Sequence, residues 1–215
     1  MVQSISFQNI SQKGGKFVSE NNLPKSRSQQ LADWTSKRIY HILSLPGNGS
    51  KAILANLRRG VGYGPGEVPA LWGIIFDDFN EDWLSRTGEP TQEEWAVYIA
   101  LTLFALHQQS KAPSSSPMYQ KGYSLGRAIS LYCKGDEDER ERFQRRFEQM
   151  AYATDINGVS YHLRRIVYFL RSANIPLDYA SLTRDLYQYQ NPDMVANVRL
   201  RWAQDFYRIP DNKSE

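Results

Sequence analysis

The sequence predicts an all-α protein, with about eight or nine helices in two packed helical halves. Apolar residues recur every three or four positions along most of the 215-residue chain, which is the period of an amphipathic helix. Residues that cap helices precede these segments, and turns rich in Gly and Pro separate them. With 41% hydrophobic and 23% charged residues, the chain has a globular composition and is long enough to bury a core of its own.

Four regions are expected along the chain. Residues 1–28 are polar and are expected to be flexible, and residues 29–109 form an N-terminal helical half. A loop at 110–123 leads to a C-terminal helical bundle at 124–207, and the last five residues are expected to form a loose tail. The apolar segments predict helices at 29–43, 50–60, 69–79, 93–109, 124–134, 137–153, 157–175, 178–190 and 192–207.

The helix starts carry recognisable caps. Thr91 and Glu94 form a capping box, in which the Thr hydroxyl accepts from the third helical amide and the Glu carboxylate accepts from the Thr amide. The helix that follows is apolar on most faces, which is typical of a helix buried on all sides, so we expect it at the centre of the core. Further caps are expected at Ser50, Ser124, Asp136, Asp178 and Asn191.

The residue inventory excludes several functional classes. The chain has one cysteine, Cys133, so it cannot form an internal disulfide, and we expect this cysteine to pack in the core. Its three histidines are widely separated in sequence and leave no ligand set for a metal. The motifs of zinc proteases, P-loop NTPases and serine hydrolases are absent. We therefore expect a protein that is not an enzyme and that uses no cofactor, metal or small-molecule substrate. Without a membrane-length apolar segment or a secretory signal, we expect a cytoplasmic protein that does not contact a membrane.

Two segments could bind ions or phosphate, but structural roles fit them better. The glycine-rich loop at 60–68 is not followed by a helix with Lys-Ser/Thr, so we expect a structural loop and not a phosphate cradle. A second segment holds four carboxylates, at Asp77, Asp78, Glu81 and Asp82. Because no His or phosphate loop accompanies them, we expect a solvated acidic face or a docking surface in place of a Mg²⁺ site.

Charge is distributed unevenly. Residues 1–60 carry nine Lys/Arg and two Asp/Glu, a net +7, whereas residues 61–120 carry two and eight, a net −6. A basic segment followed by an acidic one suggests a polyanionic partner and a basic protein neighbour.

Helical geometry, at 100° per residue, predicts where the arginines of the 157–175 helix point. Its buried stripe is expected to hold Leu163, Ile166, Val167 and Leu170. With Leu163 as zero, Arg164 and Arg171 lie at about 100° and 80°, on the rim of that stripe, whereas Arg165 lies near 200° on the exposed back. Arg164 and Arg171 have few acidic neighbours within one turn, so ion pairs within the helix explain them poorly. Because they lie one heptad apart on the same rim, they can reach consecutive phosphates of a nucleic acid.

The other arginines have more competing explanations. In the last helix Arg199 is expected at the rim of the apolar stripe, and Arg201 is expected to point away from it. Arg58 and Arg59 end a helix, where the helix dipole stabilises positive charge whether or not a ligand binds. A self-neutralised, solvated face is expected for the remaining group, Arg140, Arg142, Arg145 and Arg146.

Two tyrosines near the end of the 178–190 helix, Tyr187 and Tyr189, cannot both face the core. One of them could therefore stack on nucleic-acid bases or on a neighbouring protein.

Several blocks together resemble the CasB small-subunit family of the type I-E CRISPR surveillance complex called Cascade. The blocks are LRRG at 57–60, PGEVPALW at 65–72, YSLGRAIS at 123–130, HLRRIVYFLRSANIPLDYASLTRDL at 162–186 and QDF at 204–206. None is an active-site signature, but their order and spacing together are specific. Residues 1–28 and the loop at 110–123 fall outside the resemblance.

The resemblance implies an all-helical, non-catalytic subunit that packs with other Cascade subunits and with a second copy of itself. It implies contacts with the phosphates of crRNA and target DNA, which help to hold the heteroduplex and the displaced strand while base pairing reads the sequence. Matching motif positions give as candidate contacts Arg58, Arg59, Arg127, Arg164, Arg165 and Arg171, with Arg199 and Arg201 from the final helix. The alternative is a helical adaptor that binds only proteins, through its acidic stretch at 61–94 and its basic faces.

Overall fold

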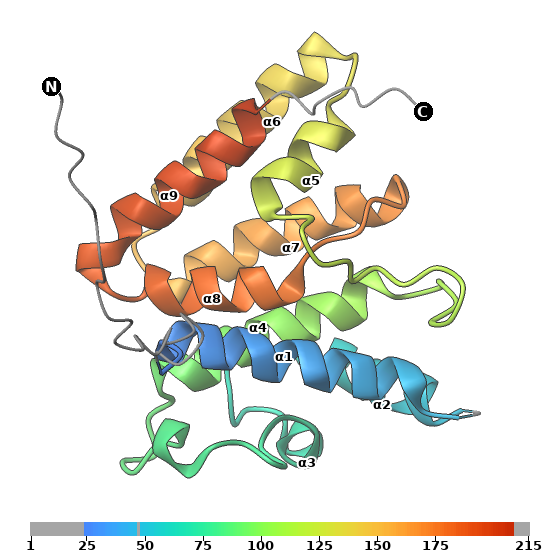
Figure 1. Ribbon diagram of the computed structural model, residues 1–215, viewed down its shortest axis with the longest axis vertical. Helices are drawn as coiled ribbons and strands as arrows, with labels where there is room; N and C mark the ends of the chain where they lie inside the picture. Colours follow the sequence, from blue (N-terminus) through green and yellow to red (C-terminus); the bar gives the residue numbers. More distant parts are fainter. Residues whose placement is uncertain (1–23, 47, 209–215) are drawn as a thin grey trace, which may run out of the picture.

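A computed structural model describes residues 24–46 and 48–208 of the chain (Figure 1). Within these ranges the predicted all-α class is confirmed: nine α-helices and two short 3₁₀ turns, Pro69–Leu71 and Glu81–Trp83, are joined by loops without a β-strand. The helices are α1 (Arg27–Ser44), α2 (Gly49–Arg59), α3 (Trp72–Ile75), α4 (Gln92–His107), α5 (Leu125–Tyr132), α6 (Glu137–Ala151), α7 (Ile156–Ser172), α8 (Tyr179–Tyr189) and α9 (Pro192–Tyr207).

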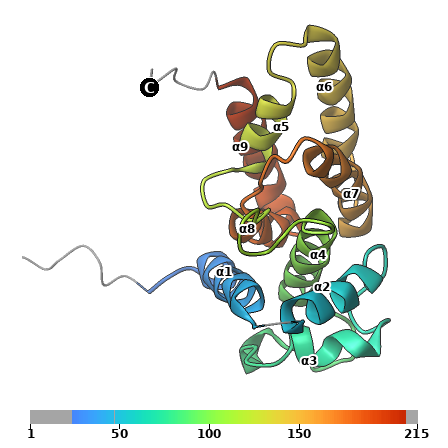
Figure 2. The same cartoon turned by 90° about the vertical axis from the view of Figure 1, so that its right-hand side faces the viewer.

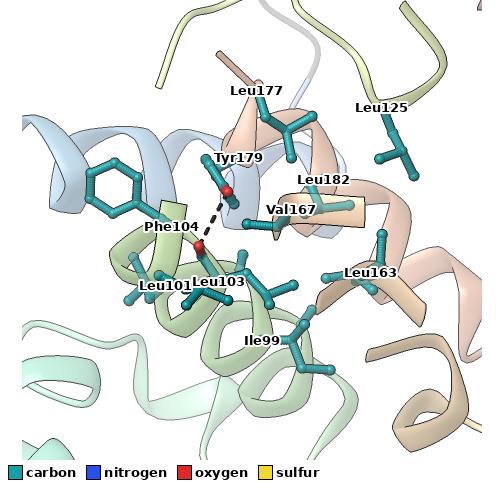
Figure 3. Close-up of a cluster of buried hydrophobic side chains, with 14 of the residues drawn as sticks. Ile99, Leu101, Leu103, Phe104, Leu125, Leu163, Val167, Leu177, Tyr179 and Leu182 are labelled. Carbon is teal, nitrogen blue, oxygen red and sulfur yellow. Dashed lines mark hydrogen bonds between the residues drawn. The ribbon is translucent and has the colours of Figure 1, made fainter. Parts of the chain in front are cut away.

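Helix α4 lies at the centre of the molecule, as its apolar sequence predicts. Its side chains from Ala96 to His107 are buried on all sides, because α1, α2, α7 and α8 all pack against it (Figures 1 and 2). Figure 3 shows the interior of this contact, where Phe104 of α4 meets Tyr179 of α8 edge to face at 5.5 Å. The buried Tyr179 hydroxyl lies 3.3 Å from the backbone carbonyl oxygen of Leu103.

The helices on the two sides of the 110–123 loop share one hydrophobic core. Helix α8 packs along α1, and α7 packs on α4, so the second half of the chain covers the first. Helices α5, α6 and α9 extend the molecule beyond α7 and α8 (Figure 1). At the crossing of α5 and α9, a Cβ placed on Gly126 would lie 2.2 Å from the Trp202 carbonyl oxygen, so the backbones of the two helices are in direct contact.

Most of the predicted helix starts are confirmed. The Thr91–Glu94 capping box is complete, with both of its hydrogen bonds formed. Side-chain caps are also present at Ser124, Asp136, Asp178 and Asn191. The prediction for Ser50 is wrong, because α2 already begins at Gly49 and Asn48 occupies the N-cap position. Helix α7 also begins earlier than predicted, because Asp155 caps it by accepting from the Gly158 amide.

The continuous helix predicted at 69–79 is also wrong. The segment forms a 3₁₀ turn and then the single α-helical turn of α3. Side chains of α1 hold the segment that follows α3, since Trp34 Nε1 donates to the Asp78 carbonyl at 3.0 Å and Arg38 donates to the Asp77 carbonyl. Asp78 has a φ of 56°, a left-handed conformation that a helix continued to residue 79 could not contain.

The two expected flexible ends fall largely outside the structure described. Residues 1–23 and 209–215 are not among the described residues, whereas Arg27 already lies in α1. Of the helices between Lys25 and Arg208, none combines the length and the apolar run that a bilayer crossing needs.

Candidate nucleic-acid interface

Helix α7 presents its arginines as its periodicity predicts. Leu163, Ile166, Val167 and Leu170 are buried. Arg164 and Arg171 are half-buried at the edge of this stripe, and Arg165 is exposed. The helix contains no Asp or Glu, so the charged side chains that it exposes are all basic.

Tyr168 lies between the two rim arginines. Its ring centroid is 5.9 Å from the guanidinium carbon of Arg164 and 5.7 Å from that of Arg171. Both distances are within the range of cation–π attraction. The tyrosine ring therefore helps to hold two positive charges on one side of α7.

Two other segments approach these arginines. A Cβ placed on Gly62 would lie 3.3 Å from Arg164 Nη1, so the loop that follows α2 reaches the rim of α7. At the other end of the rim, Arg171 Nη1 donates a hydrogen bond of 2.8 Å to Oε1 of Gln109, just beyond α4. Figure 2 shows the end of α2 turning towards α7 beside α4. The junction of α2, α4 and α7 is therefore where the basic rim lies.

A cleft of about 650 Å³ lies beside this junction and adds further cations. It is lined by Arg58 and Lys51 of α2, and by Gln108, Ser110 and Lys111 from the end of α4 and the loop after it. Lys111 also donates a hydrogen bond to the Asn174 side chain just after α7. Arg59, the last residue of α2, is exposed.

Among the described residues, the predicted arginines at the junction have no acidic partner. Within residues 24–46 and 48–208, no ion pair involves any of these candidates: Arg58, Arg59, Arg127, Arg164, Arg165, Arg171 or Arg199. Arg127, at the start of α5, is exposed and lies over the Tyr123 ring at 4.7 Å while donating to the Gly122 carbonyl. The structure thus brings Arg58, Arg164 and Arg171 around one junction, whereas Arg127 comes from a helix that packs on α9 and α7.

The arginines of α9 hold helices together. Arg201 does not point away as predicted, because it pairs with Asp185 of α8 at 2.9 Å. Asp185 is buried and also accepts from Trp202 Nε1 at 2.8 Å. Arg199 Nη2 donates to the Tyr189 hydroxyl at 3.0 Å, so both α9 arginines contribute to the packing of α8 against α9.

Of the two tyrosines near the end of α8, Tyr189 is the one that faces the core, so it cannot stack on bases. Its ring is buried and stacks on Trp202 with an interplanar angle of 15°, and its hydroxyl lies 3.2 Å from the Ala151 and Ala153 carbonyls. Tyr187 is half-buried, and this burial raises the pKa of its phenol. Tyr168, which lies between two arginines, was not singled out from the sequence, although the period of α7 places it at about 140°, next to Arg164.

The arginines of α6 divide into two kinds. Arg142 pairs with Glu139 at 2.6 Å and Arg145 with Glu141 at 3.6 Å, which confirms the self-neutralised face for these two. Arg140 and Arg146 lie instead over aromatic rings, at 4.8 Å from Phe206 and from Phe169 respectively. The prediction is wrong for this second pair, because aromatic residues of α7 and α9 replace the carboxylates of their own helix.

The structure also places the glycine-rich loop, the acidic segment and Cys133. The Gly64 amide donates to Oε1 of Glu67 at 2.6 Å, and the Tyr98 hydroxyl donates to the Gly60 carbonyl, so the glycine loop is held by the protein's own groups. The four carboxylates at 77–82 are exposed, and no group of His, Cys, Asp and Glu in the described part of the chain could hold a metal ion. Burial raises the pKa of the Cys133 thiol to about 11, which suits the predicted core role.

The chain is similar to proteins of one family. The family profile of the CRISPR-associated protein Cse2 matches residues 53–207. CasB from Thermobifida fusca is 32% identical, with a TM-score of 0.67 over 83% of this chain and 98% of that chain. CasB from M. ruber is 27% identical, with a TM-score of 0.55 over 85% and 93%. A chain of a CRISPR RNA-guided surveillance complex shares the fold at a TM-score of 0.64, with 24% identity over 84% and 94%. The comparison with curated proteins found no match.

Proposed function

This chain belongs to the CRISPR-associated Cse2 family, and from that premise we propose that it is a non-catalytic subunit of a type I-E Cascade complex. In antiviral defence it stabilises the crRNA–target heteroduplex and the displaced strand by contacts with the phosphate backbone. Base pairing reads the sequence, and the protein supplies sequence-independent electrostatic attraction. A similar fold occurs in a CRISPR RNA-guided surveillance complex, which supports this assembly.

The observation that carries the proposal is a group of guanidiniums at the junction of α2, α4 and α7 that form no ion pair with any described residue. Arg171 donates to the neutral Gln109 side chain, and the Tyr168 ring lies between Arg171 and Arg164. A phosphate that binds there breaks no internal ion pair, and a guanidinium can hold it with two parallel hydrogen bonds. Arg58, with Lys51 and Lys111, continues the positive charge into the adjoining cleft.

The exposed acidic residues suit a different partner. Asp77, Asp78, Glu81 and Asp82 follow α3 in sequence and are exposed, and the exposed Trp72 is the first residue of that short helix. An exposed aromatic side chain in a segment with four exposed carboxylates favours a basic protein surface. We assign this face to another Cascade subunit or to a second copy of the chain.

The decisive experiment is a salt titration of nucleic-acid binding by the full chain and by Arg164→Ala/Arg171→Ala. Each phosphate contact releases counterions, so the slope of log K against log salt should become shallower by about 0.7 to 0.9 per lost contact. Both side chains lie beside the buried stripe, so the variant should keep its fold, which circular dichroism checks.

The matched control is Arg142→Ala/Arg145→Ala. It removes the same net charge from exposed positions of α6, where both arginines pair with carboxylates of their own helix. Its slope should stay that of the wild type. An unchanged slope in a folded Arg164→Ala/Arg171→Ala variant would contradict the proposal and favour the adaptor that binds only proteins.

A further inference from the structure

The solvent side of α7 carries tyrosines as well as arginines. Tyr161 and Tyr168 are 59% and 43% exposed, although large aromatic side chains gain most from burial. The arginines lie among them, with the Arg165 guanidinium carbon 5.9 Å from the Tyr161 ring, and with Arg164 and Arg171 on either side of Tyr168 in sequence. No carboxylate interrupts this series on the helix.

The spacing of Tyr161 and Tyr168 places their two rings in one line along the surface of α7. Tyr161 and Tyr168 are seven residues apart, which is about 10.5 Å along the helix and about 20° around it. Bases stacked at 3.4 Å would cover this distance in about three steps, and an extended strand would cover it in fewer. The cation–π distances are near the outer limit of such contacts, so the guanidiniums attract the rings only weakly, and both rings keep much of their surface exposed.

We propose that Tyr161 and Tyr168 form a stacking platform for unpaired bases, while Arg164, Arg165 and Arg171 bind the phosphates of the same strand. Aromatic rings interleaved with arginines bind single strands without sequence preference, because every base offers a π-face. The bases of a duplex already stack on one another and offer no free face. The inference rests on the proposed function and adds that the strand on α7 is single-stranded.

The test measures the binding of the full chain to a single-stranded dT oligonucleotide and to an abasic oligonucleotide of equal length and charge. Tyr168→Ala should weaken binding to dT by about five-fold or more, because one base loses its stacking partner. Binding to the abasic strand and the salt slope should not change, because the phosphate contacts remain. Tyr168→Phe keeps the ring and should keep the wild-type affinity, and Tyr161→Ala should repeat the selective loss.

The control is Tyr40→Ala, which removes a tyrosine of similar exposure, 55%, from α1. It should leave the binding of both oligonucleotides unchanged. Equal losses on dT and abasic strands in Tyr168→Ala would overturn stacking and leave Tyr168 only as a support for the arginines. No loss of binding on either strand would also overturn the stacking proposal. So would a wild-type chain that binds duplex DNA as tightly as it binds the dT oligonucleotide. None of these results affects the salt-slope test of Arg164 and Arg171, so the two proposals fail separately.

Discussion

Each arginine takes its role from the group nearest to its guanidinium. Arg171 contacts the neutral amide of Gln109 and remains available for an anion. Arg201 contacts Asp185, whose side chain is only 4% exposed. Removing the arginine would therefore leave a buried carboxylate with less opposite charge to stabilise it. The helical angle identified the rim position of Arg164 and Arg171 because α7 contains no acid that could compete. The same angle failed for Arg201, because its partner lies on a different helix and only packing brings the two together.

A single buried histidine should make the stability of the fold depend on pH. His107 lies at the end of α4 with Nδ1 2.9 Å from the Tyr179 hydroxyl, and burial lowers its pKa from 6.5 to about 4, against the opposing effect of nearby backbone carbonyls. Between these two values the unfolded chain binds a proton that the folded chain does not. The free energy of unfolding should therefore fall by about 3 kcal/mol from this group as the pH drops from 7 to 4.

Urea denaturation at several pH values measures this effect by comparing the wild type with His107→Gln, which cannot titrate. The variant is expected to be less stable at pH 7, because it replaces a fully buried ring, but it should lose less stability on acidification. His41→Gln is the control, because it makes the same substitution at an exposed position of α1 and leaves the buried His107 in place. Parallel profiles for wild type and His107→Gln would show that His107 does not drive the pH dependence.

At the scale of the element, helix starts were predictable because their causes are local. Thr91, Ser124, Asp178 and Asn191 each accept from an amide two or three positions ahead, a bond that the sequence alone specifies. The break near Asp78 was not predictable, because the α1 side chains that bind the Asp77 and Asp78 carbonyls lie more than thirty positions away in sequence. Sequence patterns therefore predict where helices begin better than where tertiary contacts interrupt them.

The crossing of α5 and α9 depends on the absence of a side chain at Gly126. A Cβ there would lie 2.2 Å from the Trp202 carbonyl and 2.7 Å from the Phe206 amide nitrogen, and neither backbone group can move without shifting α9. Gly126→Ala should therefore lower the free energy of unfolding by about 1–3 kcal/mol, despite the better helix propensity of alanine. Urea denaturation measures the loss.

Gly73→Ala provides the comparison for this variant. Gly73 lies in α3 with no atom within 4 Å of its would-be Cβ, so alanine there should leave stability unchanged or raise it slightly. A Gly126→Ala protein as stable as Gly73→Ala would mean that α5 and α9 can separate at little cost.

At the scale of the whole molecule, the candidate interface is assembled from segments far apart in sequence. Arg58 comes from α2, Gln109 follows α4, and Arg164 and Arg171 come from α7. The sequence could suggest each arginine, because each lies in a block with a recognisable pattern. It could not show that the loop at Gly62 meets α7, or that Lys51 and Lys111 line one cleft with Arg58, because only the packing of α2 and α7 on α4 creates those contacts.

This arrangement limits how the isolated chain should bind nucleic acid. Seven of the eight candidate arginines have no carboxylate partner within the described residues, which sets an upper limit of seven phosphate contacts among them. With about 0.7 counterions released per contact on a single strand, these arginines together should contribute no more than about −5 to the salt slope. Because contacts to phosphates and stacking on base faces carry little sequence information, two single strands of unrelated sequence but matched base composition should bind equally.

Fluorescence anisotropy with two such labelled oligonucleotides, titrated from about 50 to about 200 mM salt, measures both quantities. We expect coincident curves that weaken steeply across this range, in the micromolar or weaker regime of non-specific binding. A preference of ten-fold or more for one sequence would require contacts with base edges, which phosphate binding and stacking do not supply. An affinity that is insensitive to salt would mean that the unpaired arginines do not meet phosphates, and the basic junction would then belong to a protein interface.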